Sequence, residues 1–263
     1  RQYTRKGCIS NSYSTCRKSG KKGYGRNTPD KGKSALSLNK EVRGFLFEDV
    51  CDDNDFKNMH ANMICQIATL FGQDQCVKLL KSYDDNREFW YKEMMNANPK
   101  LTREICKRIG YTFLYEGQVA YRFAEFGLEV PKKKGDPLWM VYATCSDACQ
   151  QVIKLREKIK KHFPETWENL HFNDPKRKDA GKFSSMVQHL ERYVLLKLIK
   201  KCKGDGKDVD DLQHDGLFLS VQGEPVDAGQ DWFDDVNIFI LKETGFDLQL
   251  TSKPFKVPGQ LRT

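Results

Sequence analysis

The stretch Arg103–Gly117, REICKRIGYTFLYEG, repeats a cationic or aromatic side chain every fourth residue, at Arg103, Lys107, Tyr111 and Tyr115. Residues four apart lie on one face of an α-helix, so we expect a stripe of two cations followed by two phenols. At about 1.5 Å per residue the stripe is about 18 Å long, close to the length of an extended nucleoside triphosphate. Two interpretations stay open here: the solvent-exposed face of an ordinary amphipathic helix, or one wall of a nucleotide site.

The chain has 263 residues and a net charge of +8, from 44 basic and 36 acidic side chains. A basic balance favours a polyanionic partner such as nucleic acid. No run of about 18 apolar residues indicates a membrane span and no signal peptide is visible, so we expect an intracellular protein that is not secreted. Because the first residue is Arg1 rather than methionine, we expect a fragment of a longer protein. The nine cysteines are scattered without a CxxC pair, which favours reduced thiols and gives a zinc site little support.

The first 33 residues are basic with interleaved tyrosines. They are either a flexible tail or an arm that binds along the phosphate backbone of a nucleic acid. After a short helix or turn at 37–43, the apolar Phe45–Phe47 predicts the start of a strand, and an acidic run ends at Asp55. A helical pattern follows and ends at Gly72.

The middle of the chain is mostly helical, whereas the polar residues 167–182 predict loops. The other expected elements are a long helix from Pro137 to about Lys161, a helix at Phe183–Lys201, a strand at Leu212–Val221 broken at Gly216, a helix at Trp232–Glu243 and a final strand around Leu250. This order predicts an α+β sheet domain with a helical insertion.

Asp215 follows His214 within an apolar stretch, where an ionised carboxylate is costly unless something compensates it. It is either exposed at the tip of a hairpin or paired with Asp55. Two carboxylates on adjacent strands can bind two divalent ions, which activate an attacking hydroxyl and neutralise a leaving pyrophosphate. Such chemistry also needs cations opposite the acids, and Arg103 and Lys107 are suitable.

Three parts of the sequence, namely the Asp55 region, the stripe and His214-Asp215, resemble motifs of family A DNA polymerases and occur in the same order along the chain. The stripe is similar to motif B, the fingers helix, except for an inserted Glu116. Asp55 stands where motif A has a metal-binding aspartate, and His60 stands where that motif has a glutamate five residues later. His214-Asp215 resembles motif C.

A closer resemblance is to the transposon–viral polymerase family, primase-polymerases of virophages and mobile elements that are related to family A and to phage-type RNA polymerases. It rests on Asp53-x-Asp55-x-x-Asn58-x-His60, on Asn86-Arg87-Glu88 and on His214-Asp215-Gly216. The likeness to family A covers about residues 24 to 257. Ala61 departs from the family's usual proline, and Gly216 replaces the glutamate that follows motif C in family A.

The resemblance implies an α+β fold with a polymerase palm, built from an antiparallel sheet with helices, a mostly helical fingers insertion, and a thumb that is absent or minimal. The implied domains are a basic N-terminal arm at 1–33, the first palm part with motif A at 34–85, the helical fingers with motif B at 86–182, and the second palm part with motif C at 183–263.

The resemblance also implies a role for each candidate residue. Asp55 and Asp215 would bind two metal ions, Mg²⁺ or Mn²⁺. The implied nucleotide-binding residues are Arg103 and Lys107 for the triphosphate, Tyr111 for the base, and Tyr115 with His60 for the sugar. The implied nucleic-acid contacts are Arg26, Arg43, Gln188 and His214.

The function expected from this resemblance is template-directed nucleotidyl transfer in DNA replication, by a DNA polymerase with primase activity. Its partners would be a DNA primer-template or single-stranded template, dNTP or NTP, and a fused or associated superfamily-3 helicase, with no membrane involved. The expected location is the host cytoplasm or nucleus, at a site of viral replication. His60 and Tyr111 favour dNTP, whereas Arg108 and Thr112 are typical of RNA polymerases.

Three alternatives stay open. The chain is a phage-type RNA polymerase-like primase, a non-catalytic nucleic-acid-binding module, or a metal-dependent nuclease. The nuclease ranks last because it gives no reason for the Arg-Lys-Tyr-Tyr stripe.

Overall fold

A computed structural model describes residues 3–5, 8–10, 13–15, 27–29, 38, 40–170, 178–212, 216–226 and 228–255. The chain forms two compact units. Unit 1 comprises Arg1–Met59 and Gln188–Thr263, and unit 2 comprises His60–Val187. The division falls within two helices, α2 (Met59–Leu70) and α9 (Lys178–Gly204).

Unit 1 is built on an antiparallel sheet. Its strands are β5 (Asp52–Phe56), β6 (Asp208–Leu212), β7 (Gly216–Val221), β8 (Glu224–Pro225) and β9 (Leu250–Lys253). The order is β6-β7-β5-β9, and β8 pairs with β7. The acidic strand β5 therefore has a hydrogen-bonded neighbour on each side, and Asp55 lies opposite Gly216 on β7 and Thr251 on β9.

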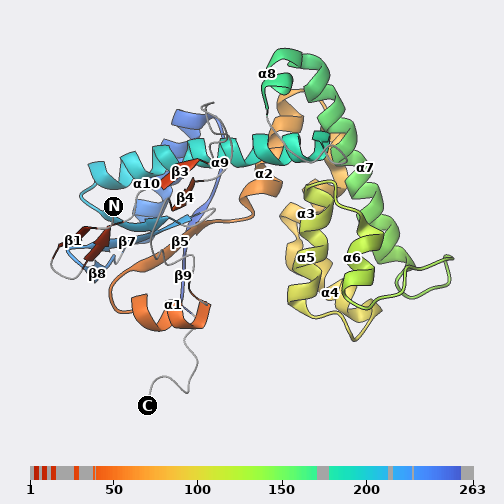
Figure 1. Ribbon diagram of the computed structural model, residues 1–263, viewed down its shortest axis with the longest axis horizontal. Helices are drawn as coiled ribbons and strands as arrows, with labels where there is room; N and C mark the ends of the chain where they lie inside the picture. The colour runs from red at the N-terminus through yellow and green to blue at the C-terminus, as the bar shows by residue number, and fades with distance from the viewer. Residues whose placement is uncertain are drawn as a thin grey trace. The chain divides into compact units, whose positions relative to one another are not determined.

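Alternation along the strands gives the sheet two different faces. One face is apolar and buried, with Phe56, Leu217, Leu219 and Leu250 all at most 1% exposed. Figure 1 shows α9 and α10 (Gln230–Thr244) together on one side of the strands and α1 (Lys40–Phe47) on the other.

The second face of the sheet bears Asp53 and Asp55 beside Phe218. Phe218 packs against Phe47 of α1 and against Phe255, with ring centroids 5.5 and 5.3 Å apart. Two two-stranded antiparallel pairs precede the sheet in the sequence: β1 (Tyr3–Arg5) with β2 (Cys8–Ser10), and β3 (Tyr13–Thr15) with β4 (Asn27–Pro29).

Unit 2 is helical. After α2 come the 3₁₀ helix η2 (Asp74–Val77), α3 (Lys78–Asp85), α4 (Arg87–Ala97), α5 (Arg103–Leu114), α6 (Val119–Glu125), α7 (Trp139–His162) and α8 (Pro164–Asn169). The long α7 is central, because it contacts η2, α3, α5, α6 and α8. Its buried side chains include Cys145, Val152 and Leu155, and α5 adds Ile109 and Phe113. Burial of these apolar faces supplies the main stabilisation of the unit.

The α+β class is confirmed, but several expected elements differ. Phe45–Phe47 is not a strand: it ends α1, and Phe47 is apolar because it packs on Phe218. The first strand of the sheet is instead the polar Asp52–Phe56, which forms because β7 and β9 pair with it on both sides.

One other prediction was wrong in part. Residues 167–182 are not simply loop, since α8 extends to Asn169 and α9 begins at Lys178. The break expected at Gly216 is present, because β6 ends at Leu212, β7 begins at Gly216, and the two strands pair antiparallel.

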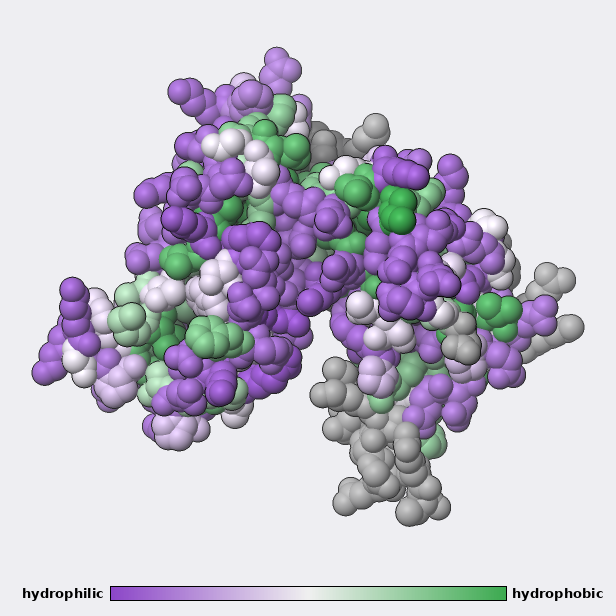
Figure 2. Space-filling view, turned by 180° about the vertical axis from the view of Figure 1, so that it is seen from behind, coloured by the Kyte–Doolittle hydropathy of each residue, from purple (hydrophilic) through white to green (hydrophobic). Residues whose placement is uncertain are grey.

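In the part of the chain that the structure describes, no helix combines the length and the apolar character needed to cross a membrane. The face drawn in Figure 2 is mostly hydrophilic, with hydrophobic side chains in small patches between polar ones. This surface agrees with the 30% of charged residues in the sequence.

Candidate functional site

The predicted helix at Arg103 is present as α5, and Tyr115 caps its C-terminus. Thr102 begins it, because its side chain accepts a hydrogen bond from the Ile105 backbone N–H at 3.3 Å. The stripe faces away from the buried side of the helix. Arg103 and Tyr111 are exposed, and Lys107 and Tyr115 are half-buried.

Close packing holds the opposite side of α5 in place. A Cβ at Gly110 would lie 2.5 Å from the Tyr83 hydroxyl and 2.9 Å from the ring carbon that bears it. Tyr83 is itself fixed, because it is 2% exposed and its hydroxyl forms a 2.9 Å hydrogen bond with that of Tyr91. Only glycine lets the two elements approach this closely, so Gly110 fixes the position of the stripe within unit 2.

The first cation of the stripe already has an anionic partner. Arg103 donates two hydrogen bonds to Glu88, at 3.0 Å from Nε and 2.5 Å from Nη2, and its guanidinium lies 5.5 Å from the centre of the Tyr91 ring. The hydrogen bond from Arg103 lowers the pKa of Glu88. Because more than half of each side chain is exposed, the pair is screened by water and contributes little stability. A more highly charged ligand such as a triphosphate can therefore compete for Arg103.

The second cation lies over the next member of the stripe. The Lys107 ammonium is 5.8 Å from the centre of the Tyr111 ring. Tyr111 is 40% exposed, so its ring offers a flat surface to a ligand. The Lys107–Tyr111 pair thus places a positive charge beside an aromatic face, which suits a ligand with a phosphate and a ring.

Tyr115 and His60 meet in the structure. The Tyr115 hydroxyl and His60 Nδ1 are hydrogen-bonded, and the rings meet edge to face with centroids 5.6 Å apart. His60 is 7% exposed at the start of α2. The two residues proposed to contact the sugar therefore form one contact at the end of the stripe.

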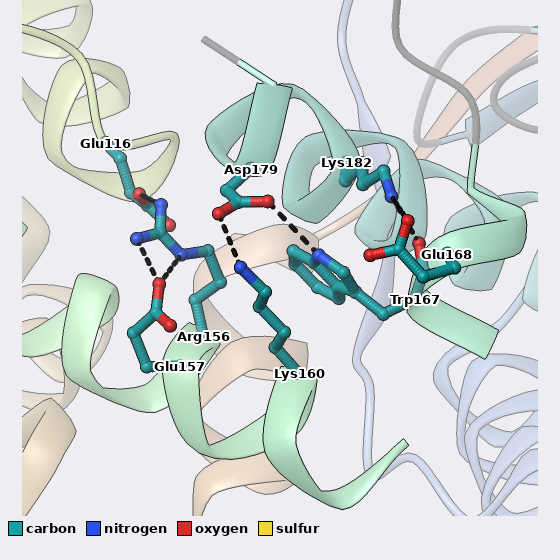
Figure 3. Close-up of polar contacts among 8 residues, drawn as sticks. All are labelled: Glu116, Arg156, Glu157, Lys160, Trp167, Glu168, Asp179 and Lys182. Atoms are coloured by element: carbon teal, nitrogen blue, oxygen red, sulfur yellow. Dashed lines mark hydrogen bonds and ion pairs between the residues drawn. The ribbon is translucent and has the colours of Figure 1, made fainter. Parts of the chain in front are cut away.

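The inserted Glu116 turns inward instead of extending the helix. It has a left-handed φ of 54°, and the Gly117 N–H donates to the Thr112 carbonyl at 2.7 Å. Its side chain is 2% exposed and pairs with Arg156 of α7, as Figure 3 shows. Burial raises the pKa of Glu116 to about 7, against the opposing effect of Arg156. Oε1 of Glu116 is buried without a hydrogen-bond partner.

Further polar contacts in Figure 3 join α7, α8 and α9. Lys160 pairs with Asp179 at 2.8 Å, and Asp179 also accepts a hydrogen bond from the Trp167 indole at 3.2 Å. Lys182 is 2% exposed and donates to the Trp167 carbonyl at 2.8 Å and to Glu168 at 3.4 Å. These bonds fix the frame behind α5 and leave its exposed stripe unaffected.

Of the two aspartates predicted to bind metal, the structure describes Asp55, which lies in unit 1. It is 9% exposed on β5, and its Oδ2 forms an ion pair with Lys253 of β9. Its other oxygen, Oδ1, is buried and has no hydrogen-bond partner. A buried carboxylate oxygen without a donor has a cost, which a bound cation would relieve.

Gly216 allows β7 to approach β5 beside Asp55. A Cβ at this position would lie 2.8 Å from the Asp55 Cα and closer still to the Asn54 carbonyl oxygen. Any side chain at position 216 would therefore collide with the backbone of β5.

The remaining predicted residues are partly accounted for. Arg43 lies on α1, with its guanidinium 6.0 Å from the centre of the Phe218 ring, and is therefore on the Asp55 face of the sheet. Gln188 is half-buried in α9. Arg26, His214 and Asp215 lie outside the described residues.

Among the residues that the structure covers, no group of three or more His, Cys, Asp or Glu side chains could hold a metal ion. Seven cysteines from Cys51 to Cys202 are free, and burial raises the pKa of Cys145 and Cys202, for example, to about 12. In the absence of a metal, such thiols stay protonated at neutral pH.

In unit 2, His60 and Tyr115 therefore contact each other at the end of the stripe, and in unit 1, Asp55 and Arg43 lie on the same face of the sheet. Sequence reasoning missed the charged partners of these groups, namely Glu88, Arg156 and Lys253. No local spacing points to them, because each reaches its partner from another helix or strand.

Comparison with known proteins adds the last observation. No family model matches the sequence, and no curated protein matches it. Among solved structures, the chain is similar to the POL domain of Pol1 from M. smegmatis, in complex with DNA primer-template and dNTP. The TM-score is 0.53 at 12% identity, over 95% of this chain and 48% of that one, so the chain spans about half the length of its structural neighbour. The fold of this chain is therefore like that of a DNA polymerase POL domain.

Proposed function

We propose that this chain catalyses template-directed nucleotidyl transfer on DNA. The observation that carries the proposal is the exposed stripe of α5, which runs from Arg103 past Lys107 and Tyr111 to the Tyr115–His60 contact. The stripe offers cations for a triphosphate, a ring for a base and a polar pair for a sugar, in that order. The polymerase-like fold is the second support.

In this proposal each residue of unit 2 has a role set by its chemistry. Arg103 exchanges Glu88 for the triphosphate, and Lys107 adds a second positive charge. Tyr111 stacks on the incoming base, an interaction of about 1–3 kcal/mol in single-stranded nucleic-acid complexes. The buried His60 holds the Tyr115 hydroxyl where the sugar would lie, so the pair discriminates between ribose and deoxyribose.

Asp55 and Asp215 are the proposed metal ligands. The fit of Asp55 rests on its buried and unpaired Oδ1, since carboxylate oxygens are the ligands that Mg²⁺ and Mn²⁺ prefer. Divalent ions bound there would supply positive charge to the transferring phosphoryl group. Asp55 itself would hold such an ion on the face of the sheet where Arg43 lies, and Arg43 would contact the nucleic-acid backbone.

The proposal also includes more specific assignments. The activity includes priming, the family is the transposon–viral polymerases, and the partner is a superfamily-3 helicase. Nucleic-acid contacts are made by Arg26, Gln188 and His214, and the chain divides into arm, palm and fingers at the ranges given above. The cationic stripe of α5 and the net charge of +8 are compatible with each of them.

The test is a primer-extension assay with the purified chain. Primed and unprimed single-stranded DNA templates are incubated with dNTPs or NTPs and with Mg²⁺ or Mn²⁺, and the products are separated on a denaturing gel. We expect the wild type to extend the primer. Asp55→Asn is expected to give no extension but to retain its affinity for the template. Absence of product from both nucleotide sets would refute the polymerase function.

The sugar role is tested with the same assay. Tyr115→Phe removes the hydroxyl that His60 contacts, and His60→Ala removes the ring behind it. Both changes are expected to raise the ratio of ribonucleotide to deoxyribonucleotide incorporation, by about tenfold for a loss of about 1.4 kcal/mol in discrimination. An unchanged ratio in both variants would remove this pair from sugar selection.

A second candidate function is a non-catalytic nucleic-acid-binding module. The observation in its favour is that Asp55 already carries an ammonium counter-ion, as a residue with no metal to bind would. Such a module binds the template in the assay above with no product under any condition, and its affinity for template is independent of divalent ions.

A further inference from the structure

Lys253 brings a positive charge to the carboxylate proposed to bind metal. On β9 it lies opposite Asp53, and Thr251, two residues earlier, lies opposite Asp55. Because side chains alternate along strands, Asp53, Asp55 and Lys253 project from the same face of the sheet. The Lys253 ammonium reaches diagonally across the two strands and pairs with Oδ2 of Asp55.

The burial of the two partners is unequal. The Asp55 side chain is 13% exposed, whereas that of Lys253 is 50% exposed. A carboxylate with so little access to water needs a nearby cation to stay ionised at low cost. Lysine meets this need and can also leave, because its flexible four-carbon stem already reaches solvent.

We propose that Lys253 is the resident counter-ion of Asp55, and that a divalent cation binds Asp55 in competition with the Lys253 ammonium. The inference rests on the proposed function, because it takes Asp55 as a metal ligand. Two cations on one carboxylate repel each other, so binding of the divalent ion drives the ammonium into solvent.

The exchange keeps the charge of this face balanced in both states. Without metal, Lys253 compensates Asp55; with metal, the ion takes over and also satisfies the buried Oδ1 that Lys253 leaves unpaired. Lys253 therefore weakens the apparent metal affinity of the chain, since part of the binding free energy is used to displace it.

The first test measures metal binding directly, without catalysis. Free Mn²⁺ is followed by electron paramagnetic resonance during titration of the wild type, Lys253→Gln, Lys253→Arg and Asp55→Asn. Lys242→Gln is the matched control, because it removes the same charge from an exposed position of α10 in the same unit. We expect Lys253→Gln to bind Mn²⁺ about threefold or more tightly than the wild type, given the partial exposure of the pair. Lys253→Arg and Lys242→Gln are expected to gain no affinity.

The outcomes separate this inference from the function on which it rests. If Asp55→Asn binds Mn²⁺ as the wild type does, Asp55 is not a metal ligand, and both the metal assignment and the inference are refuted. If Asp55→Asn loses binding but Lys253→Gln has wild-type or weaker affinity, the metal assignment stands and the competition by Lys253 is refuted.

A second measurement covers the case in which Lys253→Gln folds poorly without metal. Thermal unfolding is recorded with and without Mn²⁺ for the same variants. We expect a lower Tm for Lys253→Gln in the absence of metal and a larger rise on addition of Mn²⁺ than in the wild type, because a ligand stabilises the native state by RT ln(1 + [L]/Kd), which grows as Kd falls. A lower Tm with no larger rise would make Lys253 a purely structural partner of Asp55 and would overturn the proposal.

Discussion

Replacing Glu116 by glutamine is expected to remove a loss of stability that develops between pH 4.5 and about 7. The carboxyl is 2% exposed, Oε1 has no hydrogen-bond partner, and Arg156 is shared with Glu157. Burial is therefore stronger than the attraction of Arg156, and the pKa of Glu116 rises from 4.5 to about 7. Glutamine has the same shape and resembles the protonated acid, so Glu116→Gln isolates the effect of the charge.

The magnitude follows from the size of the shift. Folded protein holds the Glu116 proton more tightly than unfolded protein does, so the free energy of unfolding falls as pH rises between 4.5 and about 7. One pKa unit corresponds to about 1.4 kcal/mol, so the loss is about 3 kcal/mol above this window. Glu116→Gln is expected to match the wild type near pH 4.5 and to exceed its stability by up to about 3 kcal/mol at pH 8.

Urea unfolding from pH 4.5 to 8, followed by tryptophan fluorescence, measures both curves. The control is Glu157→Gln, which removes the half-exposed carboxylate from the same guanidinium and should change stability by at most about 1 kcal/mol. The opposite sign refutes the reasoning: if the Arg156 pair outweighs burial, Glu116→Gln is less stable than the wild type at pH 8, by about 3–5 kcal/mol for a broken buried pair.

Two glycines give further predictions about packing. Gly216→Ala is expected to destabilise the sheet by several kcal/mol, on the order of 3 or more, because the new Cβ meets the backbone at Asn54, which cannot give way as a side chain can. Gly135→Ala is its control: a Cβ there meets nothing within 4 Å, so urea unfolding should show a change of less than about 0.5 kcal/mol, and equal losses in both variants would contradict the steric argument. Gly110→Ala is expected to cost about 1–3 kcal/mol by crowding the Tyr83 hydroxyl. Tyr83→Phe in the same chain should recover part of that loss, and a strictly additive double-mutant cycle would show that the two residues do not collide.

Local sequence patterns were sufficient to predict helices and helix ends that depend only on residues within the same segment. The four-residue spacing predicted α5, and Gly72 was correctly expected just after a helix, where it adopts a left-handed φ. Composition did not predict the secondary structure of segments whose conformation depends on contacts with other segments. Phe47 is apolar because it packs on Phe218 from α1, and the polar Asp52–Phe56 is a strand because β7 and β9 pair with it on both sides.

For the candidate site, too, some features came from the sequence and others only from the structure. The sequence supplied Asp55, His60 and the stripe, because their types and spacing resemble polymerase motifs. The contact between His60 and Tyr115 was expected only as a shared role, and the structure adds the hydrogen bond between them. Their functional roles stay predictions.

By itself, the sequence determined the α+β class, the helix that carries the stripe, and the order of the motifs along the chain, because hydrophobic periodicity and capping are local properties. The tertiary structure alone decided which charge meets which: Glu88 with Arg103, Arg156 with Glu116, and Lys253 with Asp55. Such pairs depend on strand register and helix packing between distant segments, and no spacing within one segment encodes them.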